Sequence, residues 1–332
     1  MRRGWLPLAL MATLIVALGA FSHAHHSVFL SNLNLNSLLL ETMPLALVSL
    51  GQVCALLVGG FDVSVAALMT MCVVTASFTL TPTMSGAGLI PGALSVVGVG
   101  LATGLFNALL IRVFRLPSIV ATLGTLSILE GASLLLRAYP TGAINYDVTT
   151  ALNSGVSFVP YAFIGVVVLA LVADAWLYRT RAGLALRAVG FDSTSSRRLG
   201  MSAGRTILLA FVACSLMASV AGFYLAAEVQ VGSPIIGNQA LESIAAAVLG
   251  GASLAGGRGS FVGALLAAFF LTEIDNVLPL FQQPAEYADM TIGGLILLAL
   301  VLYQAPELIA RARTARRRLG AAPAPAGEAS AT

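Results

Sequence analysis

Long, uninterrupted apolar runs dominate the chain, and polar residues are confined to short segments between them. The runs are about twenty residues long, the length of α-helix that crosses the hydrocarbon core of a bilayer. They lack the ten-residue segments of alternating polarity that membrane β-barrels show. We therefore expect an all-α polytopic membrane protein of about ten transmembrane helices, at residues 5–21, 38–59, 63–80, 88–110, 117–136, 156–177, 206–227, 242–256, 259–278 and 288–303.

Two places in this pattern are less regular than the rest. The run at 242–256 is short and bounded by glycine, and Gly59-Gly60 leaves only a tight turn between two neighbouring runs. Either segment could be re-entrant. Three units follow from the pattern, namely a first helix with its outer loop at 1–37, a transmembrane core at 38–304, and a basic, then Ala/Pro-rich tail at 305–332 that we expect to be disordered.

Composition supports the membrane assignment. Of the 332 residues, 58% are hydrophobic and only 9% are charged, with a mean hydropathy of +0.94. Soluble domains carry about 25% charged residues. A soluble enzyme, a nucleic-acid-binding domain and a single-pass receptor are thereby excluded. The three cysteines lie inside apolar runs without paired spacing, so neither a disulfide framework nor a zinc site is expected.

The arginines predict the orientation of the chain. All 17 basic residues are arginine, and with the expected spans all of them except Arg137 fall on one side of the membrane. The positive-inside rule assigns that side to the cytoplasm. Both termini are then cytoplasmic, which requires an even number of spans.

Polar residues within or beside the spans are the candidate functional groups. Asp62 and Ser64 follow Gly59-Gly60, where a carboxylate can cap the next helix, and an ion or proton site is the alternative. The histidines at 23, 25 and 26 lack further ligands, so we expect no metal site. The glycine-rich segment 250–260 lacks the Lys-Ser/Thr of a phosphate-binding loop, and no catalytic arrangement is visible.

The longest cytoplasmic loop, 178–205, combines arginines with Leu184, Leu186, Val189 and Leu199. Asp192 can begin a short helix that Gly200 ends. The loop is either a solvated positive-inside segment or a pair of short helices presented to a cytoplasmic partner.

Several blocks of the sequence resemble one family, the permease subunit of ribose-type bacterial ABC sugar importers, over about residues 40–303. The strongest block is QALESIAAAVLGGASLAGGRGS at 239–260, which contains Glu242, Gly250, Gly251, Gly256 and Gly257. GGFDVSVAA at 59–67 and LPSIVATLGTLSILEG at 116–131 are similar to two further family blocks. The loop 178–205 is similar to a fourth, with Gly183, Ala188, Gly190 and Gly200 in place.

The resemblance implies a type II-like importer permease of the bacterial inner membrane that works by alternating access. A cytoplasmic ABC ATPase would dock on the loop 178–205, including Arg187 and Asp192, and would bind the ATP, so that this chain carries no cofactor. A periplasmic or lipid-anchored binding protein would deliver a monosaccharide or related polyol. A second permease copy or a homologous permease would complete the path, with membrane lipid but no nucleic acid as a further partner. Candidate path residues are Asp62, Ser64, Asn107, Thr122, Thr125 and Ser127.

Two other functions remain open at this point. A branched-chain amino acid permease of the same wider superfamily would favour a more charged path. In an ion- or proton-coupled secondary transporter, Asp62, Glu130 or Glu273 would be the titrating group.

Overall fold

The computed structural model describes residues 5–235, 237, 239–284, 287, 290–295 and 297, with side chains from residue 7 onward. The chain forms two compact units, residues 1–288 and 289–332, and the first is described here. Its helices are α1 (Trp5–His25), α2 (Asn32–Leu57), α3 (Val65–Thr79), α4 (Leu89–Arg112), α5 (Ser118–Leu136), α6 (Tyr146–Asn153), α7 (Tyr161–Arg179), α8 (Arg181–Phe191), α9 (Ser193–Arg198), α10 (Ala203–Val229), α11 (Gln239–Leu249) and α12 (Phe261–Leu280).

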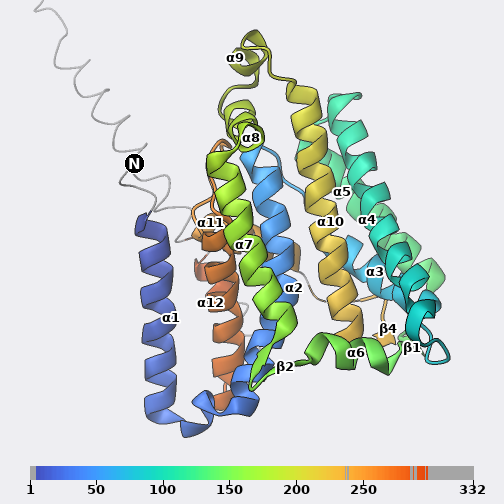
Figure 1. Ribbon diagram of the computed structural model, residues 1–332, viewed down its shortest axis with the longest axis vertical. Coiled ribbons are helices and arrows are strands. Elements are labelled where there is room, and N and C mark those ends of the chain that lie inside the picture. The colour runs from blue at the N-terminus through green and yellow to red at the C-terminus, as the bar shows by residue number, and fades with distance from the viewer. Residues whose placement is uncertain are drawn as a thin grey trace, which may run out of the picture. The chain divides into compact units, whose positions relative to one another are not determined.

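Short turns and strands connect these helices. The 3₁₀ turns are η1 (Ser27–Leu30) and η2 (Gly86–Gly88). Strand β1 (Thr141–Ala143) pairs antiparallel with β4 (Val231–Gly232), and β2 (Gly155–Val156) pairs antiparallel with β3 (Val159–Pro160). The strands and α6 lie together at one end of the helices, opposite α8 and α9 (Figure 1).

The expected all-α polytopic architecture is confirmed. Among the described residues, seven helices are long and apolar enough to cross a membrane: α1, α2, α4, α5, α7, α10 and α12. The helices α3 and α11 are shorter and apolar. The expected span at 288–303 lies mostly outside the described residues.

The expected span at 242–256, for which a re-entrant segment is the alternative, is not one continuous helix. Helix α11 ends at Leu249 and an irregular segment follows to Ser260. Gly251, with a φ of 101°, ends the helix, and Gly256 and Gly257, with φ angles of 87° and 76°, keep the segment after it non-helical. The 11 residues of α11 rise about 16 Å, roughly half the hydrocarbon thickness.

A second difference concerns the start of α2. The predicted boundary between residues 37 and 38 falls inside this helix, which begins at Asn32. Ser31 caps it by accepting a hydrogen bond from Asn34 N at 3.3 Å, and the Asn34 side chain donates to Asn276 Oδ1 on α12 at 3.0 Å. The polar first turns therefore belong to the helix because their side chains have partners there.

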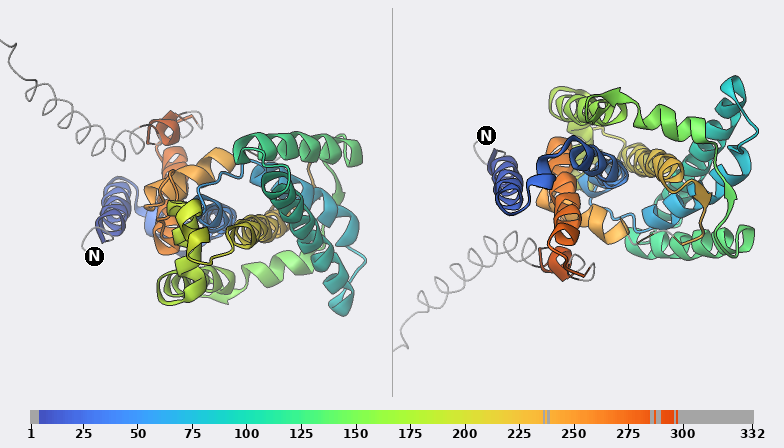
Figure 2. Two further views of the ribbon diagram at one scale, coloured as in Figure 1. Left: turned by 90° about the horizontal axis from the view of Figure 1, so that it is seen from above. Right: turned by 90° about the horizontal axis from the view of Figure 1, so that it is seen from below.

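The centre of the unit is α10, which packs against α2, α3 and α4. Glycines allow these close approaches, as is usual between membrane helices. A methyl group at Gly51 of α2 would lie 2.8 Å from Cys214 O, and one at Gly104 of α4 would lie 2.8 Å from Val212 Cα. Seen along the helices, α1 lies at one edge and α4 and α5 lie at the opposite edge (Figure 2).

Candidate functional site: a buried polar network and a glycine junction

Five of the six candidate path residues meet in one buried network beside the turn between α2 and α3. Asp62 lies in the turn that joins these helices and is fully buried. Its Oδ1 accepts hydrogen bonds from Ser64 N at 3.0 Å and Ser64 Oγ at 2.5 Å. Asp62 therefore closes a local turn on Ser64 just ahead of α3, and the expected cap is not formed, because α3 has no side-chain cap hydrogen bond.

The network continues into α4 and α5. Asn107 Nδ2 donates to Ser64 Oγ at 2.9 Å and lies 3.4 Å from both carboxylate oxygens of Asp62. Thr125 Oγ1 donates to Asn107 Oδ1 at 2.6 Å. Each of these side chains is exposed by 3% or less. Three helices and the turn are thus held in one arrangement by a chain of hydrogen bonds.

A second contact fixes the same turn to the start of α5. Val63 N donates to Thr122 Oγ1 at 3.2 Å, and Phe61 N donates to Ser118 Oγ at 3.1 Å. Both hydroxyls satisfy backbone donors that would otherwise be costly at this depth. The sequence did not single out Ser118, although its position directly after Pro117 marks the first residue of a helix.

Ser127 does not belong to the network. It lies on the exposed face of α5, opposite the face that carries Thr122 and Thr125. Glu130 is exposed on the same outward face as Ser127. Glu273, the third carboxylate considered for ion coupling, is buried on α12 beside Gly19 of α1. The three carboxylates considered for ion coupling, Asp62, Glu130 and Glu273, therefore lie in three separate parts of the structure.

Three of the family-like blocks meet at a second site, which we call the glycine junction (Gly59, Gly190, Gly256 and Gly257). Gly257 N donates to Leu57 O at the end of α2, at 3.0 Å. A methyl group at Gly256 would lie 2.6 Å from Gly190 O and 3.0 Å from Gly59 Cα. The turn after α2, the end of α8 and the segment after α11 are thus in backbone contact.

Gly190 is the tightest position of the glycine junction. A methyl group there would overlap Leu57 O and lie 2.8 Å from Gly257 N. Because backbone atoms cannot yield as a flexible side chain can, only glycine fits here. Gly59 and Asp62 belong to the same short turn, so α8 is connected to the buried network through residues 58–62.

The rest of the glycine-rich block closes α11 against α12. A methyl group at Gly250 would overlap the backbone of Gly263 and Ala264, and Gly251 has a φ of 101°. Ser260 caps α12 by accepting from Gly263 N at 3.0 Å. Glu242 is half-buried in the first turn of α11, away from the crossing.

The helix α8 is anchored to α7 at its other end. Gly183 approaches the backbone of Leu177 so closely that a methyl group would overlap it. The Arg187 guanidinium lies over the Tyr178 ring, 4.7 Å from its centroid, and Tyr178 Oη donates to Gly259 O at 2.7 Å. The loop 178–205 and the glycine-rich block 239–260, two separate family-like blocks, therefore pack against each other.

Asp174 on α7 was missed by the sequence analysis. Its Oδ1 accepts from Phe261 N at 2.7 Å and its Oδ2 from Ser260 Oγ at 2.9 Å, so it caps α12 from a neighbouring helix. A single carboxylate in an otherwise apolar run was the available signal.

The predicted short helices of the loop 178–205 are confirmed as α8 and α9. Asp192 caps α9 by accepting from Thr194 N at 2.9 Å and Ser195 N at 3.2 Å. The hydrogen bond from the Ser195 hydroxyl is the main reason why the pKa of Asp192 is lowered. Gly200 follows the helix with a φ of 81°.

The apolar residues of this loop divide into two sets. Leu186 and Val189 are buried and hold α8 on the bundle. Leu184, Phe191 and Leu199 are exposed by 51%, 78% and 76% respectively. Exposed apolar side chains beyond the ends of membrane helices indicate a surface for a partner.

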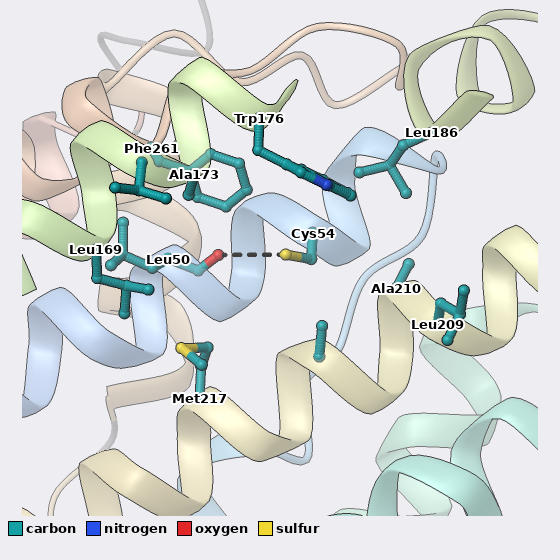
Figure 3. Close-up of a pocket in the computed structure, with 12 residues that line it drawn as sticks. Leu50, Cys54, Leu169, Ala173, Trp176, Leu186, Leu209, Ala210, Met217 and Phe261 are labelled. Carbon is teal, nitrogen blue, oxygen red and sulfur yellow. Dashed lines mark hydrogen bonds between the residues drawn. The ribbon is translucent and has the colours of Figure 1, made fainter. Parts of the chain in front are cut away.

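An apolar cavity of about 280 Å³ lies between α2, α7 and α10, beneath α8 (Figure 3). Trp176, Leu186 and Met217 point toward it, and Cys54 donates back to Leu50 O of its own helix at 3.7 Å. Because its lining offers almost no hydrogen-bonding groups, it does not suit a polyhydroxylated solute.

Comparison with known proteins places the chain in a family. The sequence profile described as "Branched-chain amino acid transport system / permease component" matches residues 34–300. The chain is 37% identical to the autoinducer 2 import system permease protein LsrC of Enterobacter sp. (strain 638) over 301 residues, 87% of this chain and 83% of that protein. It is 35% identical to LsrC of Yersinia pseudotuberculosis serotype O:3 (strain YPIII) over 262 residues, 78% of this chain and 73% of that protein.

No solved structure matches the chain. The relatives are transport components rather than enzymes, as the sequence analysis expected, and the apolar helices agree with a multi-pass inner-membrane protein. The chain therefore belongs to the permease-component family of branched-chain amino acid transport type, as a membrane subunit of an ABC importer.

Proposed function

We propose that this permease imports a small neutral polyhydroxylated solute, a monosaccharide or related polyol, with autoinducer 2 as the first candidate. The observation that carries the proposal is the identity of 35–37% to autoinducer 2 import permeases over most of both chains. The family profile is named for branched-chain amino acids, whereas these relatives are named for autoinducer 2, so the profile's name alone does not decide the cargo.

Uptake into proteoliposomes tests the cargo. The chain is reconstituted with its ATPase and binding protein, and autoinducer 2, ribose and leucine are supplied with ATP sealed on the ATPase side. We expect ATP-dependent uptake of autoinducer 2 or ribose and none of leucine. Uptake of leucine alone would assign the branched-chain amino acid alternative, and uptake driven by a pH or sodium gradient without ATP would assign a secondary transporter.

We further propose that the ATPase docks on the exposed apolar side chains of α8 and α9 and binds the ATP, while this chain binds no cofactor. Movement of α8 would reach the buried polar network through the glycine junction. The end that carries α8 and α9 also carries the arginines at 112, 115, 179, 181, 187, 197, 198, 205 and 258, whereas Arg137 lies at the other end near β1. This asymmetry supports a cytoplasmic α8–α9 end, cytoplasmic termini and delivery by a binding protein at the opposite end.

Replacing Phe191 by Ala tests this docking surface. Because the ring is 78% exposed, its loss should leave the permease folded and weaken its association with the ATPase by about tenfold, as for an aromatic anchor of an interface. Tyr139→Ala, 68% exposed at the opposite end, is the matched control and should bind as the wild type does. Affinity is measured by titrating labelled ATPase onto the purified permease. Equal weakening in both variants would show that the exposed side chains of α8 and α9 are not the ATPase docking surface.

The outward face of α5 is proposed to meet a second permease copy or homologue along the substrate path. Ser127 and Glu130 are exposed in the middle of a spanning helix, where lipid contact is costly. On the same face, Gly124 and Gly131 have open space around them and would let another helix approach closely. In this arrangement Ser127 lines the path, whereas the Asp62 network braces the helices behind it.

Cysteine cross-linking tests this pairing. Ser127→Cys should form a disulfide-linked permease dimer under mild oxidation in native membranes, because two copies would face each other across α5. Val168→Cys, at a position exposed by 52% on α7, is the control and should stay monomeric. Cross-linking of the Val168→Cys variant but not of the Ser127→Cys variant would move the interface to α7.

A further inference from the structure

A cavity lined by three arginines lies at the α8–α9 end and plays no part in the proposed transport path. Arg112 and Arg115 at the end of α4, Arg197 of α9, and Gly204 in the first turn of α10 surround about 520 Å³, together with Ile111 and Ile207. None of the six lining residues is a carboxylate. The three positive charges therefore share one cavity without a lining counter-charge.

The backbone adds to this positive field. Gly204 lies in the first turn of α10, a 27-residue helix, so the positive end of its dipole adjoins the cavity. Gly204 also leaves room for the Arg112 guanidinium, because a methyl group there would lie 2.6 Å from Arg112 Nε. Guanidinium groups next to a helix N-terminus are the usual means of holding a phosphate.

Arg115 stands where the backbone favours another residue. It ends the α4 turn with a φ of 57°, the left-handed conformation that favours glycine. Leu116 N donates to Leu110 O at 3.2 Å and holds this turn. The demands of the turn therefore do not explain an arginine side chain here, whereas a charge directed at an anion does.

The surroundings point to a ligand at the membrane surface. Arg112 is the last residue of a membrane-spanning helix. Val113 and Phe114, next to the arginines in the chain, are exposed by 60% and 64%. Apolar side chains beside arginines at a helix end fit the acyl chains and headgroup of an anionic lipid.

We propose that this arginine cavity binds a phosphate group, that of an anionic lipid headgroup. The proposal does not depend on which solute the permease carries. An inorganic or sugar phosphate from the cytoplasm offers the same chemistry, and the experiment below separates the two sources.

Binding is measured by native mass spectrometry of the delipidated full-length permease, titrated with phosphatidylglycerol, phosphatidylcholine or inorganic phosphate. We expect one phosphatidylglycerol to bind at least about tenfold more tightly than phosphatidylcholine. Millimolar inorganic phosphate should displace little of it. If phosphate binds in its place, the source is soluble; if phosphatidylglycerol shows no preference over phosphatidylcholine and phosphate does not bind, the proposal fails.

Three variants distinguish lipid binding at the arginine cavity from a general effect of positive charge on the permease. Arg115→Gly suits the backbone, so the fold should survive while the phosphatidylglycerol preference is lost. Gly204→Ala keeps every charge but displaces the Arg112 guanidinium, and should weaken binding severalfold. Arg179→Gln, which removes an arginine from the last turn of α7, is the control and should bind as the wild type does. Unchanged lipid binding in Arg115→Gly, with weakened ATPase association, would assign the arginines to the ATPase interface and overturn the proposal.

Discussion

Gly190→Ala is expected to reduce ATP-driven uptake strongly. The added methyl group would overlap Leu57 O and press on Gly257 N, so α8 must move away from the end of α2. Overpacking of this kind costs about 1–3 kcal/mol in a packed site. The larger effect is on transport, because the displaced contact is the one that connects α8 to the turn carrying Asp62.

Uptake and ATP hydrolysis are measured together for this variant. We expect uptake to fall at least about tenfold while the ATPase still hydrolyses ATP, because a rate that depends on a coupled movement falls when the coupling is weakened. Gly165→Ala is the matched control, because a methyl group there meets nothing within 4 Å. Wild-type uptake by Gly190→Ala would show that the glycine junction does not transmit the movement.

The arrangement of spans was largely predictable, and its errors have identifiable causes. Hydrophobicity marks where a helix lies in the membrane but not where it ends. At 242–256 the apolar residues continue past Leu249, yet the positive φ angle of Gly251 ends α11. At the start of α2 the opposite occurs, because polar residues are helical where Ser31 and Asn276 satisfy them.

The membership of the buried network was predictable residue by residue, but its assembly was not. Asp62, Asn107 and Thr125 stood out as polar residues in apolar surroundings. They are 45 and 18 residues apart in sequence, so their meeting depends on how α3, α4 and α5 pack. Ser127 could have been separated from Thr125 beforehand, because residues two apart lie on different faces of a helix.

The surfaces were the least predictable part. Phe191 and Leu186 are both apolar residues of the same loop, yet one is 78% exposed and the other 5%. Which of them faces a partner follows from the orientation of α8 on α7, which Gly183 and the Arg187–Tyr178 contact determine. The meeting of Arg112, Arg115 and Arg197 likewise depends on contacts between separate helix ends.

Exchanging the side chains at positions 62 and 107 should distinguish a hydrogen-bond network that holds the helices together from a proton-binding site. Asp62→Asn places its amide donors against those of Asn107, and Asn107→Asp places two carboxylates together. Each single change leaves buried polar groups without partners, at a cost of about 1–3 kcal/mol. We expect each to lower the free energy of unfolding and to reduce uptake severalfold.

The double variant Asp62→Asn with Asn107→Asp should recover most of both losses. The amide introduced at position 62 can still accept from Ser64 N through its oxygen, and the Ser64 hydroxyl can turn to donate to the carboxylate at position 107, where the Asn107 amide now lies 2.9 Å from Ser64 Oγ. The carboxylate introduced at position 107 accepts from that amide and from Thr125 Oγ1, so each donor again meets an acceptor. Stability is followed by detergent unfolding and transport by uptake, with Thr13→Ala, at an exposed position of α1, as a control outside the network.

The two readings of Asp62 differ in what this double variant does to transport. In an ion-coupled carrier that titrates Asp62, moving the carboxylate to another helix would leave transport abolished. In a bracing network the position of the charge is secondary, because what holds the turn, α4 and α5 together is the matching of donors to acceptors. Recovery of uptake in the double variant would therefore show that the network contributes matched hydrogen bonds, and that transport does not depend on a titrating carboxylate at position 62.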